Sequence, residues 1–113
     1  IKYSIEIPDS FSGKSLKMEQ RHDFWLVFKE IVTNAVRHSS CSEIEIKLFN
    51  DSDYLCLTIS DNGIGFNSEI PSANNGVKNI RSRSKTLGGT SEINTSIGNG
   101  TQWKIKIPLT VTK

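Results

Sequence analysis

The spacing of apolar residues changes several times along this chain of 113 residues, and that spacing limits the folds open to it. Residues 1–9 place apolar side chains at every second position, which is the period of a β-strand. From about Leu16 to Ser39 they recur at steps of three and four, which predicts a long amphipathic helix. Residues 42–50 and 54–60 alternate again, so we expect two strands joined by a hairpin turn.

The second half of the chain repeats this change of period. Residues 67–76 are rich in Ser and Asn and have no periodicity, which predicts a loop. A helical stripe follows and stops at Gly88-Gly89. The stripe consists of Val77, Ile80, Ser84 and Leu87. Two further strands are expected at 90–97 and 101–109, separated by a GNG turn.

The predicted order of strands and helices indicates an α+β fold. We expect a two-layer α/β sandwich, with both helices on one face of a mixed, mostly antiparallel sheet of about five strands. The other sheet face should be partly polar, because charged residues alternate outward along the strands. These residues are Lys2, Glu6, Glu43, Glu45, Lys47, Lys104 and Lys106.

Length and charge restrict the kinds of partner. The chain fits a single domain over residues 1–113, and its net charge of +2 is too small to argue for direct contact with nucleic acid. No apolar run approaches the ~20 residues that span a bilayer, so we expect no membrane contact by this domain. Cys41 and Cys56 lack metal-ligand spacing and are interpreted as free thiols in a reducing compartment. A start at Ile1 without a signal-peptide pattern suggests a fragment of a longer protein.

The first candidate motif is EIVTNAVRHS, residues 30–39, on the first predicted helix. Glu30, Asn34 and His38 are each four residues apart and form one polar stripe on that helix. A carboxylate and an amide oxygen side by side suit Mg²⁺, which takes oxygen ligands and keeps several waters. The alternative is a solvated helix face, on which Arg37 and His38 favour the helix C-terminus electrostatically.

The second motif is SDNGIGF, residues 60–66, which follows a predicted strand. As a turn it needs little explanation, because Asn-Gly is a strong turn dipeptide. As a ligand site it would use the carboxylate of Asp61 to read a polar edge of the ligand. Gly63 and Gly65 would then let the backbone lie against that ligand.

Two more glycine-containing motifs lie further along. NNGV, residues 74–77, opens the second helix with Gly76 and Val77, and a helix N-terminus offers backbone N–H groups to a phosphate. GNGT, residues 98–101, makes a tight turn and places the hydroxyl of Thr101 after it. The alternative interpretation of NNGV is a loop-to-helix junction, and that of GNGT is a β-hairpin.

Taken together and in this order, the motifs resemble the ATP-binding domain of sensor histidine kinases, in the gyrase, histidine-kinase and MutL superfamily. EIVTNAVRHS resembles the N box of that family and SDNGIGF its G1 box. NNGVKNIRSRSKTLGG resembles the next glycine box, and GGTSEINTSIGNGTQWKIKIPL resembles the usual C-terminal ending. The form TNAVRHS and the short spacing between the glycine boxes are most similar to the NarX/DesK-like branch.

The resemblance implies a role for each matching residue toward ATP and Mg²⁺. Asp61 would accept a hydrogen bond from the adenine 6-amino group, with Gly63 and Gly65 beside the purine and Thr101 close to Asp61. Asn34 would supply the Mg²⁺ ligand, and Glu30 would orient Asn34 or a metal-bound water. The residues expected near the phosphates are Arg37, His38, Gly76 and Val77.

The resemblance also implies a reaction and partners. The domain would donate the γ-phosphoryl group to a histidine on a separate dimerisation domain, for onward transfer to a response regulator. It would be a cytoplasmic domain, in a parent protein that can be membrane-anchored. His22 lies eight residues before Glu30, about 12 Å along the same helix, so we expect it not to be the phosphoacceptor.

Two other functions stay open at this point. One is a serine kinase of the anti-sigma-factor type, which shares the N and G1 boxes. The other is a scaffold that no longer binds ATP, suggested by Asn74 at a position where the family usually has glycine.

Overall fold

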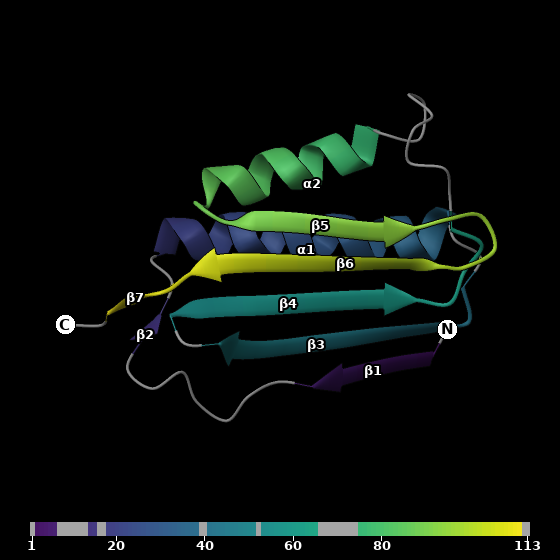
Figure 1. The fold of residues 1–113 in the computed structure, drawn as a ribbon, viewed down its shortest axis with the longest axis horizontal. Coiled ribbons are helices and arrows are strands. Elements are labelled where there is room, and N and C mark those ends of the chain that lie inside the picture. The colour runs from purple at the N-terminus through teal and green to yellow at the C-terminus, as the bar shows by residue number, and fades with distance from the viewer. Residues whose placement is uncertain are drawn as a thin grey trace.

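The computed structural model of the chain describes residues 2–6, 14–15, 18–38, 41–51, 53–65 and 75–111. Its main feature is a five-stranded sheet in the order β1-β3-β4-β6-β5. The strands are β1 (Lys2–Glu6), β3 (Glu43–Asp51), β4 (Tyr54–Asp61), β5 (Thr90–Thr95) and β6 (Thr101–Pro108). Only β1 and β3 pair in parallel, and every other neighbouring pair in this sheet is antiparallel. The predicted mixed, mostly antiparallel sheet is therefore confirmed (Figure 1).

Two helices form the second layer, α1 (Met18–His38) and α2 (Asn75–Thr86). They contact each other, and they pack on β4, β5 and β6 from one side of the sheet (Figure 1). After α2 the chain turns at Gly88, where φ is +76°. The N–H of Gly88 donates to the carbonyl of Lys85 and that of Gly89 to the carbonyl of Ser84, both at 2.9 Å. This pair of bonds is a Schellman motif, and it explains the helix stop predicted at the two glycines.

The core lies between the helices and the inner face of the sheet. It joins Val27, Ile31 and Ala35 of α1 to buried strand residues that include Ile59, Trp103 and Ile105. The predicted stripe of the second helix is confirmed, because all four of its residues are buried. Ser84 is among them, 1% exposed, and its hydroxyl donates to the carbonyl of Ile80 at 2.8 Å. The residues predicted to alternate outward are all exposed.

The inner face of β1 differs from the rest of the sheet. Tyr3 and Ile5 pair with Ile44 and Ile46 of β3, so they share the inner face, yet they are 51% and 60% exposed. Since β1 is an edge strand and the helices pack on β4, β5 and β6, this end of the inner face is left open. The alternating pattern predicted the strand but not its exposure.

Two short strands were not predicted. Lys14–Ser15 (β2) and Thr110–Val111 (β7) pair antiparallel as a separate sheet, at positions outside the predicted helices and strands. Most of the loop predicted at 67–76, including Asn74, lies outside the described residues. Its last two positions, 75 and 76, belong to α2, which begins at Asn75. Neither described helix is long and apolar enough to cross a lipid bilayer.

Candidate functional site

The predicted site residues come from segments that meet at one end of the molecule. In Figure 1 the C-terminal end of α1, the end of β4, the start of α2 and the connection between β5 and β6 all lie at the same end. The first three segments carry Asn34, Asp61 and Gly76 respectively, and Thr101 begins β6 directly after the fourth. Residues far apart in the sequence are therefore brought to one edge of the sandwich.

At this end the inner face of the sheet changes from apolar to polar. One row across the strands consists of the apolar residues Ile46, Ile59, Trp103 and Ile93. The next row toward the end consists of Ile44, Asp61, Thr101 and Thr95. Three polar side chains thus continue the core-facing side of the sheet, where a ligand between sheet and helices would meet them.

Asp61 is the last residue of β4 and is partly buried. Burial raises the pKa of its carboxyl above the ordinary value, and backbone hydrogen bonds from Gly63 and Thr101 partly offset this rise. The N–H of Gly63 donates to Oδ1 of Asp61 at 2.9 Å. Backbone N–H groups on two segments therefore orient the Asp61 carboxylate.

Thr101 is the direct partner of Asp61 across β4 and β6. The resemblance placed Thr101 beside Asp61, and its role toward adenine stays a prediction. The hydroxyl of Thr101 lies 2.9 Å from the hydroxyl of Thr95 on β5. Thr95 in turn donates to the carbonyl of Gly100 at 3.0 Å. The polar row is thus connected by hydrogen bonds across strands β5 and β6.

Gly65 and Gly100 have a packing role that involves no ligand. Both have positive φ, +65° and +71°. A Cβ on Gly65 would overlap the carbonyl oxygen of Ser96, and a Cβ on Gly100 would overlap that of Asp61. The turn after β4 is therefore pressed against the turn before β6. Contact of Gly63 and Gly65 with a purine stays a prediction, and Gly63 itself is buried.

The helical residues of the predicted site lie in the second half of α1. Glu30 and Asn34 are partly buried and lie one helical turn apart, so their side chains project on the same side. Arg37 is exposed. His38 is the last residue of α1, and its side chain lies outside what is described. His22 is exposed in the first half of the same helix.

The second helix begins at Asn75, so Gly76 and Val77 lie in its first turn as predicted. The side chain of Val77 is buried in the core, 6% exposed. A contribution of Val77 to ligand binding would therefore come from its backbone N–H, which is one of the free donors at a helix N-terminus.

The donor set fits Mg²⁺ held mainly by a phosphate ligand. Among the described residues no group of three or more His, Cys, Asp or Glu side chains forms a metal cluster. Mg²⁺ needs none, because it commonly takes one or two protein oxygens and completes its shell with phosphates and waters. The amide oxygen of Asn34, with the carboxylate of Glu30 one turn away, is a donor set of that kind.

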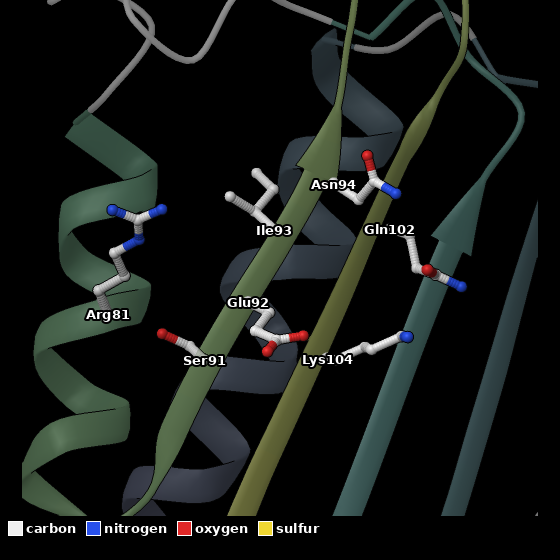
Figure 2. A pocket seen from close by; sticks show the side chains of 7 residues that line it. All are labelled: Arg81, Ser91, Glu92, Ile93, Asn94, Gln102 and Lys104. Carbon is white, nitrogen blue, oxygen red and sulfur yellow. The ribbon is translucent and has the colours of Figure 1, made fainter.

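A separate surface pocket lies beside the sheet edge and contains none of the predicted site residues. Figure 2 shows Arg81 of α2 facing Ser91 and Ile93 of β5, with the other lining residues on β5 and β6. The remaining lining residues are Glu92, Asn94, Gln102 and Lys104. The site motifs thus lie at the strand ends and not in this pocket.

Comparison with known proteins shows the family to which the chain belongs. Residues 19–111 match the family model described as "Histidine kinase-, DNA gyrase B-, and HSP90-like ATPase", and the chain belongs to that family. Among curated relatives it is similar to the sensor protein VraS of Staphylococcus haemolyticus and of Staphylococcus epidermidis. Each is 39% identical over 84 residues, which are 74% of this chain and 24% of the relative. The matched part is thus about a quarter of each relative.

Solved structures show the same fold. The histidine kinase domain from the Erythrobacter litoralis EL346 blue-light activated histidine kinase aligns with a TM-score of 0.78 at 22% identity. That alignment covers 95% of this chain and 51% of the other. The Acinetobacter baumannii histidine kinase AdeS aligns with a TM-score of 0.73 at 18% identity, over 95% of this chain and 53% of the other. The predicted α/β sandwich is therefore confirmed, and assignment to the NarX/DesK-like branch stays a prediction.

Proposed function

We propose that this chain is the catalytic ATP-binding domain of a sensor histidine kinase. It binds Mg-ATP and donates the γ-phosphoryl group to a histidine on a dimerisation domain, from which a response regulator is phosphorylated. The observation that carries the proposal is the polar row of Asp61, Thr101 and Thr95 at the end of the core-facing side of the sheet. Membership of the ATPase family and similarity to the sensor protein VraS support it.

In this proposal the two ends of ATP have different partners. Asp61 accepts a hydrogen bond from the adenine 6-amino group, and Thr101 lies beside it. Guanine has a carbonyl at that position, which a carboxylate would repel, so Asp61 selects the base. Gly63 and Gly65 pass near the purine.

The triphosphate lies toward the helices. Asn34 holds Mg²⁺, with Glu30 orienting Asn34 or a metal-bound water. Arg37 and His38 add positive or hydrogen-bonding groups near the phosphates, and the backbone at Gly76 and Val77 donates from the start of α2. When bound, Mg²⁺ neutralises phosphate charge, which is much of what phosphoryl transfer requires of its catalyst. No nucleophile on this chain is needed, because the acceptor is the histidine of the partner domain.

Thermal unfolding with and without a non-hydrolysable Mg-ATP analogue tests the proposal. At one hundred times the Kd, binding should add about 2.7 kcal/mol to the free energy of unfolding of the parent chain. EDTA, which removes Mg²⁺, should abolish the part of this stabilisation that depends on the metal. Asn34→Ala should lose the same part. Asp61→Asn should bind the adenine analogue less well and lower its preference over the guanine analogue.

Asn94→Ala is the matched control, because Asn94 is an exposed asparagine on the outer face of β5, away from the proposed site. It should behave like the parent chain. No stabilisation of the parent by saturating nucleotide would overturn the proposal. Equal stabilisation by adenine and guanine analogues would overturn the role of Asp61.

A further inference from the structure

Both polar atoms of the Asn62 side-chain amide form hydrogen bonds with residues that are distant in sequence. Its Oδ1 accepts hydrogen bonds from the backbone N–H of Ser42 at 2.9 Å and of Glu43 at 3.0 Å. Its Nδ2 donates to Oγ of Ser42 at 2.9 Å. The backbone N–H of Asn62 also donates to the carbonyl of Glu43, at 3.3 Å. We call this set of bonds between Asn62 and residues 42–43 the Asn62 clamp.

The residues that Asn62 holds are themselves fixed to α1 and β1. The carbonyl of Ser42 accepts a hydrogen bond from the N–H of Lys2 at 2.8 Å. Cys41, directly before Ser42, is buried, and its thiol lies 3.5 Å from the carbonyl of Ala35 in the last turns of α1. Ala35 follows Asn34 in that helix. The clamp therefore connects the turn after β4 to the part of α1 that carries Asn34.

On its other side the clamp holds Asp61. Asp61 directly precedes Asn62, and its carboxylate accepts the N–H of Gly63, which directly follows Asn62. A rotation of the backbone at residue 62 would move both the carboxylate of Asp61 and the donor that orients it. The position of that carboxylate thus depends on where Asn62 is anchored.

We infer that Asn62 is a positioning residue for nucleotide binding, which sets the place of the Asp61 carboxylate relative to α1 through its bonds to Ser42 and Glu43. This inference rests on the proposed function, since it assigns Asp61 to the adenine and Asn34 to the metal. In this inference Asn62 itself contacts neither the adenine nor the metal. It fixes the separation of the two protein groups that must hold the two ends of one ligand.

A role in the turn alone does not account for these bonds. An Asn-Gly turn is favoured by the backbone conformations of its two residues, and an asparagine in a turn typically hydrogen-bonds to backbone only about two residues away. Asn62 is exposed, yet its side chain bonds to residues 19 and 20 positions earlier. Displacing a group that positions a ligand by about 1 Å can cost about a hundredfold in function, so an anchor of this kind has a measurable effect on binding.

The test compares Asn62→Ala, Asn62→Gln, Ser42→Ala and Ser42→Thr with the parent chain and with Asn94→Ala. For each, the Kd of a non-hydrolysable ATP analogue and of its GTP counterpart is measured by calorimetry below the melting temperature of that variant. Asn62→Ala should weaken the adenine analogue about tenfold, which corresponds to the loss of one or two hydrogen bonds, and should lower the adenine-to-guanine preference. Asn62→Gln keeps the amide but lengthens its reach, so it should show the same direction of change.

The serine variants isolate one bond of the clamp. Ser42→Ala should weaken binding less than Asn62→Ala, and Ser42→Thr, which keeps the hydroxyl, should restore the parent affinity. Asn94→Ala should match the parent throughout. A lower melting temperature with unchanged Kd and unchanged base preference in Asn62→Ala would overturn the inference, as would parent-like binding by Asn62→Gln. If the parent chain binds no nucleotide, the proposed function itself is overturned, and the inference with it.

Discussion

Gly100 and Asp61 lie so close together that any side chain on residue 100 would overlap the backbone carbonyl oxygen of Asp61. The turn before β6 is thus packed directly on the end of β4, where the candidate adenine residue is found. The backbone of Gly100 also has a φ of +71°, which L-residues with a Cβ rarely adopt. Both facts make residue 100 a sensitive position for the fold and for the site together.

Gly100→Ala should lower the free energy of unfolding by about 2–4 kcal/mol, from left-handed backbone strain and from the overlap with Asp61. Gly98→Ala is the matched control, since Gly98 has a φ of +86° and a Cβ added there would meet no atom within 4 Å. It should cost only the strain, about 1–2 kcal/mol. Urea unfolding of both variants gives the comparison, and equal costs would contradict the overlap.

Asp61→Asn should stabilise the nucleotide-free chain at neutral pH. Burial raises the pKa of Asp61 in the folded state, so the folded chain keeps this proton at pH values where the unfolded chain has lost it. Stability contributed by this group is therefore lost as pH rises from the ordinary carboxyl pKa through the raised folded value. The amide introduced by Asp61→Asn is neutral, so its burial does not carry the cost of burying a charge.

The difference in free energy of unfolding between Asp61→Asn and the parent should accordingly be present at pH 7. It should vanish near pH 3, where the Asp61 carboxyl of the parent is protonated in both the folded and the unfolded chain. Urea midpoints measured at several pH values check this. Destabilisation of the variant at pH 7 that vanishes near pH 3 would contradict the prediction, because it would mean that the hydrogen bonds to Asp61 outweigh the cost of burying its charge.

Ile46 and Ile5 are neighbours across β3 and β1, but their exposure differs, 4% against 60%. Ile46→Ala should lower the free energy of unfolding by about 2–5 kcal/mol, because it leaves a cavity in the core. Ile5→Ala should change it by less than about 0.5 kcal/mol, as for most exposed positions. Chemical denaturation of the two variants measures both values. A large cost at Ile5 would show that the inner face of β1 is covered in solution.

Cys56 and Cys41 should differ from a thiol of the unfolded chain in their reaction with a disulfide reagent. Burial and the charge of Asp51 raise the pKa of Cys56, with a smaller opposing effect of Lys106. Since the thiolate is the reactive form, Cys56 should react more slowly than an unfolded thiol at pH 8 and faster as pH rises. Cys41 is buried and should react only after unfolding. Cys56→Ser identifies which rate belongs to which residue, and fast labelling of the folded Cys56→Ser variant would contradict the burial of Cys41.

Period and motif order predicted most of the fold and the elements on which the candidate site residues lie. The stripe from Val77 to Leu87 is buried as expected, because helical spacing and burial follow from the same geometry. The resemblance implied that Thr101 lies beside Asp61, and the two are cross-strand partners. Such features depend on local pattern or on motifs that a family keeps in a fixed order.

Other features depend on contacts that no local pattern contains. The two-residue strands β2 and β7 are too short to have a period. The exposure of Tyr3 and Ile5 depends on where the helices end, and this is a property of packing. The packing role of Gly65 depends on the carbonyl of Ser96, and the clamp of Asn62 on residues 42–43. In both cases the partner is distant in sequence, so the local turn pattern alone does not predict it.

The position of β6 in the sheet has a consequence for the synthesis of the chain. β6 lies between β4 and β5, although both of these strands precede it in the sequence (Figure 1). A nascent chain that has not yet released residues 101–108 from the ribosome has unpaired strand edges on β4 and β5 where β6 belongs, and such edges favour aggregation. Asp61 and Thr101 meet only when β6 inserts between β4 and β5, so the proposed adenine site forms in a non-local step of folding.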